Sequence, residues 1–97
     1  MSRFKNKIAI VTGAGQGVGY ACAEKFIKEG ATVIGVGRTK EKLEKAQKEL
    51  GKSYVPFTMD VGSIKDWEKL VAFVKKEYGE IDYLVNNAAS SKRTSLR

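Results

Sequence analysis

Histidine is absent from this chain of 97 residues, and cysteine and proline occur once each. The absence of histidine excludes acid–base catalysis by an imidazole and most zinc sites, and we expect no metal. The single cysteine, Cys22, excludes a disulfide within the chain and fits a reducing compartment. We interpret Cys22 as a small apolar side chain on a helix.

Long apolar runs are also absent. The apolar stretch at 8–11 breaks at Thr12-Gly13, too soon for a membrane span or a signal-peptide core. The length suffices for one small domain. We therefore expect residues 1–97 to form the N-terminal portion of a single NAD(P)-binding domain, with no second domain, no membrane contact and a cytoplasmic location.

The net charge of +7 raises the question of nucleic-acid binding. Acidic side chains precede lysines by four positions on one predicted helix, as Glu41 does Lys45, which favours a solvated helix face. The unbalanced excess lies largely at the two ends of the chain. Because no pattern of interleaved aromatic and basic residues accompanies it, we expect no nucleic-acid partner.

Strand and helix patterns alternate along the chain. Strands are predicted at 8–11, 32–36, 54–59 and 81–85, and helices at 17–29, 40–50 and 63–78. Such alternation predicts parallel strands joined by right-handed crossovers. The fold class is therefore α/β, a Rossmann-type doubly wound parallel sheet that is incomplete, with about four strands and three helices.

Individual residues refine this plan. Pro56 cannot donate to a strand ladder, so the third strand is expected at a sheet edge. Ser63 and Asp66 have the spacing of a capping box at the start of the third helix. Apolar spacing predicts two inward helix faces, made of Val18, Cys22 and Phe26 in the first helix and of Ile64, Trp67, Leu70, Val71, Val74 and Tyr78 in the third.

A glycine-rich segment, Thr12-Gly-x-x-x-Gly-x-Gly19, follows the first strand and opens the first helix. Glycines allow a tight turn and a close approach of phosphate to backbone amides, and a helix N-terminus favours negative charge. The context of a strand before and a helix after predicts a site for a dinucleotide pyrophosphate. A plain glycine turn without a ligand is the alternative.

Polar or glycine signals follow the other strands too: Gly37-Arg38, Asp60-Val61 and Asn86-Asn87. The carboxyl ends of parallel strands meet at one edge of the sheet, where phosphate sites lie. Each signal has an ordinary alternative: a solvated charge for Arg38, a helix N-cap for Asp60, and a strand-end turn for the two asparagines.

With these motifs, together with Asn86-Asn87-Ala88-Ala89, the chain resembles the N-terminal half of a short-chain dehydrogenase/reductase over residues 7–89. Ala89 stands where the family more often has glycine. The resemblance implies that the glycines shape the pyrophosphate turn, that Asp60 accepts from the adenine amino group, and that Asn86 pins the fourth strand. The cofactor-binding residues implied are Thr12, Gly13, Gly15, Gln16, Gly17, Val18, Gly19, Gly37, Arg38, Thr39, Asp60, Val61, Asn86, Asn87, Ala88 and Ala89.

The end of the second strand bears on the choice of cofactor. An acidic residue there would bind the ribose 2′-hydroxyl of NAD and repel a 2′-phosphate. This chain has Gly37 and then Arg38, whose guanidinium can pair with a phosphate. NADP is therefore favoured, with NAD as the alternative.

In the family, the catalytic tyrosine is followed four residues later by a lysine. None of the four tyrosines in this chain has a lysine at that position. The family resemblance implies an oxidoreductase that transfers a hydride between nicotinamide and an alcohol or carbonyl compound, represented here by its dinucleotide-binding half. The alternative is a catalytically silent dinucleotide-binding fragment or a truncated regulatory module. No catalytic residue is assigned in this chain, and self-association is expected.

Overall fold

The computed structural model describes residues 4–13 and 17–86. The elements follow in the order β1 (Ile8–Thr12), α1 (Gly17–Lys28), β2 (Thr32–Gly37), α2 (Lys40–Leu50), β3 (Tyr54–Thr58), α3 (Ile64–Glu77) and β4 (Tyr83–Asn86). Every element predicted from the sequence is present, and its ends lie within two residues of the expected ones. The α/β fold class is confirmed.

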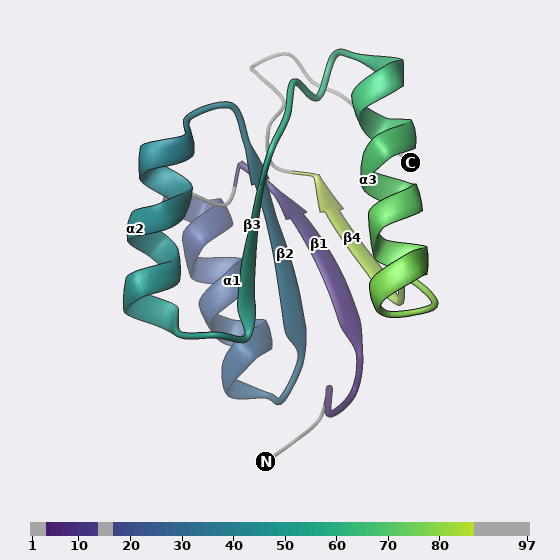
Figure 1. The fold of residues 1–97 in the computed structure, drawn as a ribbon. Helices are drawn as coiled ribbons and strands as arrows, with labels where there is room; N and C mark the ends of the chain where they lie inside the picture. Colours follow the sequence, from purple (N-terminus) through teal and green to yellow (C-terminus); the bar gives the residue numbers. More distant parts are fainter. Residues whose placement is uncertain (1–3, 14–16, 87–97) are drawn as a thin grey trace.

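The four strands form one parallel sheet in the order β3-β2-β1-β4 (Figure 1). In the register, Ile10 of β1 lies between Ile34 of β2 and Leu84 of β4. β1 is buried at every position, as a central parallel strand should be. β3 lies at an edge, where its Pro56 removes no inner ladder bond, so that prediction is confirmed.

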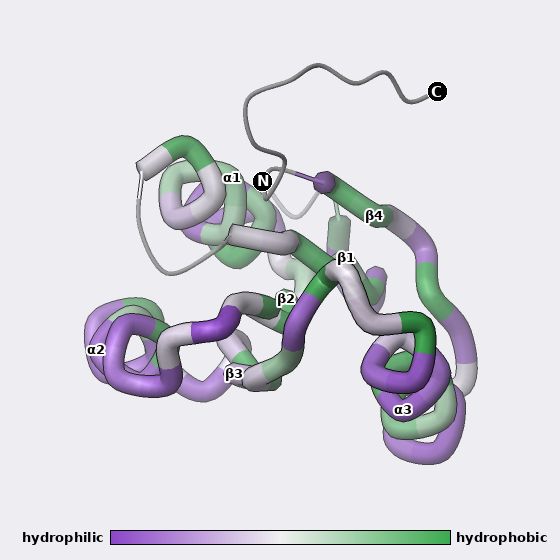
Figure 2. Tube along the Cα trace, turned by 90° about the horizontal axis from the view of Figure 1, so that it is seen from above, coloured by the Kyte–Doolittle hydropathy of each residue, from purple (hydrophilic) through white to green (hydrophobic). Residues whose placement is uncertain are grey.

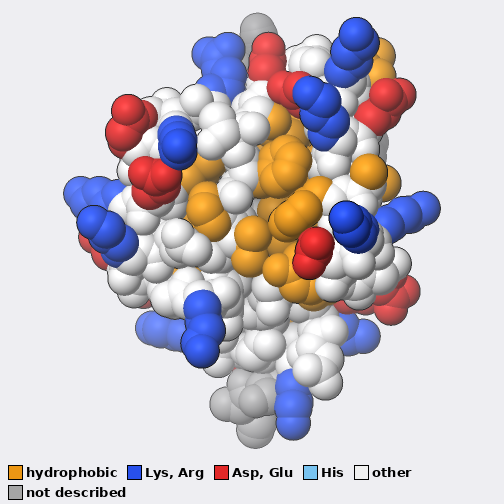
Figure 3. All heavy atoms as spheres, in the orientation of Figure 1, with side chains coloured by type: hydrophobic (Ala, Val, Ile, Leu, Met, Phe, Trp, Pro, Cys, Tyr) orange, Lys and Arg blue, Asp and Glu red, His pale blue; other side chains and the backbone are white. Residues whose placement is uncertain are grey.

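Helices cover both faces of the sheet, which is the doubly wound arrangement (Figure 2). Side chains alternate between the two faces along each strand. One core cluster includes Ala23 of α1 and Leu43 of α2. The other includes Leu70 and Val74 of α3. In Figure 3, apolar side chains gather near the middle of the visible face, where Figure 1 places β3 and α3.

The predicted inward faces of two helices are partly wrong. Val18 is 69% exposed and Ile64 is 76% exposed. The buried residues of α1 are Gly19 and Ala23, so this helix approaches the sheet through small residues. Val71 on α3 and Tyr78, the C-cap of that helix, are also exposed. Helical periodicity identifies an apolar stripe, but the contact with the sheet covers only part of its width.

Three contacts that the sequence did not suggest lie near the starts of β1 and β4. The ring of Phe4 lies 4.9 Å from that of Phe26 and 5.2 Å from that of Tyr83. The carboxylate of Asp82 accepts a hydrogen bond of 2.8 Å from the backbone N–H of Ile8. Among the described residues, no helix is long and apolar enough to cross a membrane.

Candidate functional site

The carboxyl ends of the strands meet at one edge of the sheet and bring together residues that are distant in sequence. Thr12 at the end of β1 is paired with Val36 on one side and with Asn86 on the other. The end of β2 is joined to the segment after β3 by a hydrogen bond of 2.8 Å, which the N–H of Met59 donates to the carbonyl of Gly37. Those predicted site residues that lie in the described part of the chain are therefore at the carboxyl ends of adjacent strands.

Thr12 is buried and ties two of these strand ends together. Its hydroxyl lies 3.0 Å from Oδ1 of Asn86, to which it donates, and 3.4 Å from the carbonyl oxygen of Val85. The bond fixes the side chain of Asn86 at the end of β4. The side chain of Thr12 thus adds a contact between the carboxyl ends of β1 and β4 to the backbone pairing of these two strands.

The two glycines that flank the turn between β1 and α1 have a backbone conformation that suits a phosphate site. Gly13 and Gly17 both have a φ of +63°, which side-chain-bearing residues rarely adopt. A Cβ added at Gly17 would meet no atom within 4 Å, so the space beside the helix start is open. The first turn of α1 carries no acidic residue. The unpaired amides of a helix N-terminus therefore face no local carboxylate, and these residues fit a pyrophosphate.

Two residues of this segment, Gly15 and Gln16, lie outside the described residues. Val18, also predicted to contact cofactor, is exposed on α1. Gly19 is buried on the same helix, where the lack of a side chain lets the helix pack closely. Gly13 and Gly17 thus differ from Gly19: the first two have positive φ beside the turn, and the third is buried on the helix.

The segment after β2 is open to solvent. Arg38 and Thr39 are both exposed, and Gly37 is half-buried. Thr39 is the N-cap of α2 but makes no side-chain capping hydrogen bond. A Cβ at Gly37 would lie 3.4 Å from the side chain of Leu43, an ordinary contact. The cationic side chain of Arg38 is therefore available beside the end of the second strand.

Asp60 and Val61 follow β3 in a turn that is stabilised by hydrogen bonds to nearby residues. Oδ1 of Asp60 accepts a hydrogen bond of 2.8 Å from the N–H of Gly62. The N-cap of α3 is Ser63, whose hydroxyl accepts from the N–H of Asp66, so Asp60 is not the cap. The capping box is only half formed, because the carboxylate of Asp66 accepts from the N–H of Asp60 at 2.9 Å.

The remaining predicted residues, Asn87, Ala88 and Ala89, lie outside the described part of the chain. In the part that is described, no group of three or more cysteine, aspartate or glutamate side chains could hold a metal ion.

Two tyrosines have altered acidity. Burial raises the pKa of Tyr54 to about 12. The pKa of Tyr20 is raised mainly because its hydroxyl donates a hydrogen bond of 2.8 Å to Glu49. A tyrosine that exchanges protons near neutral pH needs a lowered pKa. Neither of these two side chains has the environment of such a catalyst.

Comparison with known proteins places this architecture among dehydrogenases. The family model of the short chain dehydrogenases matches residues 7–97. The 3alpha-hydroxysteroid dehydrogenase of Mediterraneibacter gnavus is 41% identical over 97 residues, covering 95% of this chain and 39% of that protein. The NADP-dependent (R)-specific alcohol dehydrogenase of Lentilactobacillus kefiri is 40% identical over 96 residues, covering 97% of this chain and 38% of that protein.

A solved structure agrees with these matches. The crystal structure of a short chain dehydrogenase from Bacillus anthracis superposes with a TM-score of 0.85 at 42% identity, covering 89% of this chain and 36% of that one. The chain thus spans between a third and half of the length of the relatives described.

Proposed function

Since the chain belongs to the short-chain dehydrogenase family, we propose that it is the dinucleotide-binding half of an NADP(H)-dependent oxidoreductase. The bound nicotinamide would supply the hydride chemistry, exchanged with an alcohol or carbonyl carbon of a small substrate. The residues of this chain would bind and orient the dinucleotide. We propose that residues 1–97 belong to a single domain that works in the cytoplasm, a reducing compartment that suits a chain with one cysteine.

The choice of NADP rests on the exposed Arg38, which follows β2 with no acidic residue at the strand end. A guanidinium pairs with phosphate through two N–H groups and stacks on a planar base. A carboxylate at the same place would instead favour the 2′-hydroxyl of NAD. The named cofactor of the Lentilactobacillus kefiri relative is in line with this choice.

Other residues have separate tasks in this proposal. The turn around Gly13 and the first amides of α1 take the pyrophosphate. Asp60 accepts from the adenine amino group, and Val61 lies beside it. Thr12 and Asn86 keep the ends of β1 and β4 together, and the family resemblance implies that the backbone from Asn86 to Ala88 would lie along the cofactor.

The direct test is titration calorimetry of the chain with NADPH and with NADH. We expect tighter binding of NADPH by about tenfold or more, because the 2′-phosphate gains a charge-assisted pair. Equal affinities would overturn the choice of NADP but leave dinucleotide binding in place. Absence of binding to either cofactor would overturn the proposed site.

A catalytically silent dinucleotide-binding module is the second candidate. It is favoured by the sequence, in which none of the four tyrosines is followed four residues later by the lysine of the family's catalytic pair. Both candidates bind cofactor. Turnover assays with NADPH and simple ketones distinguish them only in a longer form that also carries the family's tyrosine and lysine, because only an oxidoreductase would then consume NADPH.

A further inference from the structure

The segment between β3 and α3 is fastened to the first turns of α3 by two side chains. The carboxylate of Asp66 accepts from the backbone N–H of Asp60 at 2.9 Å. The indole Nε1 of Trp67 donates to the backbone carbonyl of Val61 at 2.7 Å. The two bonds hold consecutive residues of the loop: Asp60 through its backbone N–H and Val61 through its backbone carbonyl.

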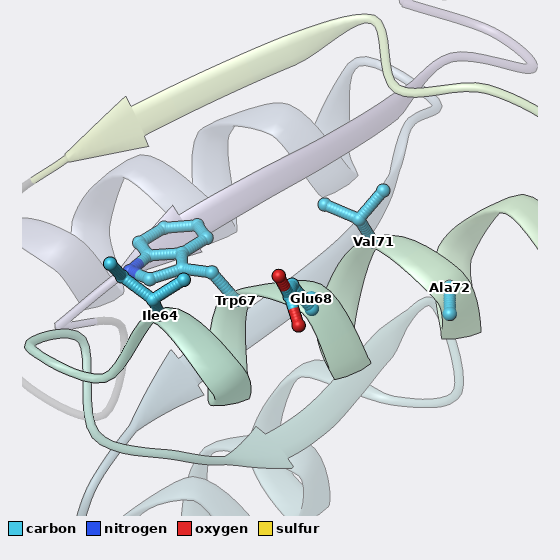
Figure 4. A pocket seen from close by; sticks show the side chains of 5 residues that line it. All are labelled: Ile64, Trp67, Glu68, Val71 and Ala72. Carbon is cyan, nitrogen blue, oxygen red and sulfur yellow. The ribbon is translucent and has the colours of Figure 1, made fainter.

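These contacts come from the same end of α3. In Figure 4 the indole of Trp67 lies beside Ile64, at the end of the helix where the loop from β3 enters. Both Asp66 and Trp67 are half-buried, whereas Asp60 is exposed. The two hydrogen bonds to α3 are therefore partly sheltered from water, whereas the carboxylate of Asp60 faces solvent.

The fastening leaves the Asp60 carboxylate able to bind a donor. Oδ1 accepts from Gly62, and a carboxylate has about four acceptor positions, so Oδ2 can accept from a ligand. The backbone groups of Asp60 and Val61 that bond to α3 are satisfied within the protein. A ligand at this loop thus meets a carboxylate whose backbone is already fixed.

We propose that Asp66 and Trp67 are positioning residues that set Asp60 for recognition of the 6-amino group of adenine. This inference rests on the proposed function, since it assumes that an adenine dinucleotide binds at the strand ends. Neither residue contacts the base itself. Each acts by holding one backbone group of the loop, and a fixed acceptor loses less entropy on binding.

The test compares NADP⁺ with its analogue in which hypoxanthine replaces adenine, so that the 6-amino donor becomes an acceptor. The unmodified chain should bind NADP⁺ about tenfold more tightly than the analogue, as expected for a hydrogen bond to a charged group. Titration calorimetry measures both affinities in every variant, including Trp67→Phe, which removes the only tryptophan of the chain. The ratio of the two affinities is the informative quantity, because a general loss of protein stability lowers the affinities for both ligands alike.

Three variants and one control complete the design. Trp67→Phe keeps an aromatic ring but removes the donor, and Asp66→Ala removes the acceptor. Both should reduce the preference for adenine to about twofold or less. Asp66→Asn retains an acceptor oxygen and should restore most of it. Glu68→Ala changes an exposed carboxylate at the adjacent helix position and should leave the ratio unchanged.

The outcomes separate the inference from the proposed function. If the unmodified chain prefers adenine and folded Trp67→Phe and Asp66→Ala keep that preference, the inference is wrong and the cofactor site stands. Equal binding of both ligands by the unmodified chain would overturn the inference and the adenine contact of Asp60, but it would leave dinucleotide binding in place. Failure to bind either ligand would overturn the proposed function and the inference with it. Should Trp67→Phe not fold, the Asp66 pair decides.

Discussion

The phenol of Tyr54 lies over Gly35 of the neighbouring strand, in the space that a side chain at position 35 would fill. A Cβ at Gly35 would overlap the hydroxyl and ring of Tyr54. The tyrosine is fully buried, and its hydroxyl has no hydrogen-bond partner among the described residues. The pair fills the core between β2, β3 and the helices α1 and α2.

Gly35→Ala should therefore destabilise the fold by about 1 to 3 kcal/mol, because the buried ring has little room to move. Gly37→Ala is the matched control on the same strand, where the added methyl would make an ordinary contact with Leu43 at 3.4 Å. Urea denaturation measures both changes. Equal free energies of unfolding in the two variants would contradict the crowding at Gly35.

Tyr54→Phe should raise the free energy of unfolding by about 1 kcal/mol near neutral pH, because it removes a buried hydroxyl without a partner. Its effect should change at high pH. The folded pKa of about 12 exceeds the usual value of 10.0, so the unfolded chain releases the proton first. Stability linked to Tyr54 is complete below pH 10 and is lost as the pH rises toward 12.

Tyr54→Phe should therefore lose less stability than the unmodified chain over that pH range. Every other side chain is the same in the two proteins, so the difference between the two curves isolates Tyr54. Parallel curves from pH 9 to pH 12, a window of roughly one unit below and two above the ordinary tyrosine pKa, would contradict the burial of an ionisable phenol.

The pairing of Tyr54 with Gly35 also marks what the sequence could and could not predict. The order of elements and the cap at Ser63 were predictable, because glycine stops, periodicity and capping are local signals. The exposure of Ile64 was not, because it depends on what packs against the helix. The partner of Asp66 was not either, since two backbone amides compete for one carboxylate and only the folded loop decides.

Arg38→Asp should weaken NADPH binding by about 2 to 4 kcal/mol and change NADH binding far less, because it replaces a bidentate cation with a repulsive carboxylate. Lys42→Asp makes a similar change of charge at an exposed position on α2 and should have a small effect on both ligands. Calorimetric titration of the two variants gives the comparison. Similar losses in both would mean that the effect is general electrostatics.

Gly17→Ala should impair dinucleotide binding beyond its effect on stability. The residue has a φ of +63° and open space around it, so alanine adds backbone strain without a clash. Gly51→Ala is a close match, with a φ of +93° and the same open space, at the end of α2. Both should lose about 1 kcal/mol of stability. Only Gly17→Ala should lower the affinity for NADPH, and equal affinities would contradict a phosphate site at the turn.

The exposed side of β4 should make the chain self-associate. Within the described residues, β4 pairs only with β1, and Leu84 is 57% exposed. A strand paired on one side offers free backbone groups to a second chain, and exposed apolar side chains favour the contact. Leu84→Lys should shift the chain toward monomer in sedimentation velocity, because a charge on an edge strand opposes pairing.

The matched control for this last variant is Leu50→Lys, at the far end of α2, where the side chain is half-buried and away from β4. That substitution should lower stability without changing the sedimentation of the folded fraction. A monomeric unmodified chain at high concentration would contradict association through β4. Association that persists unchanged in Leu84→Lys would place the contact on another surface, with the exposed Ile64 of α3 as the next position to substitute.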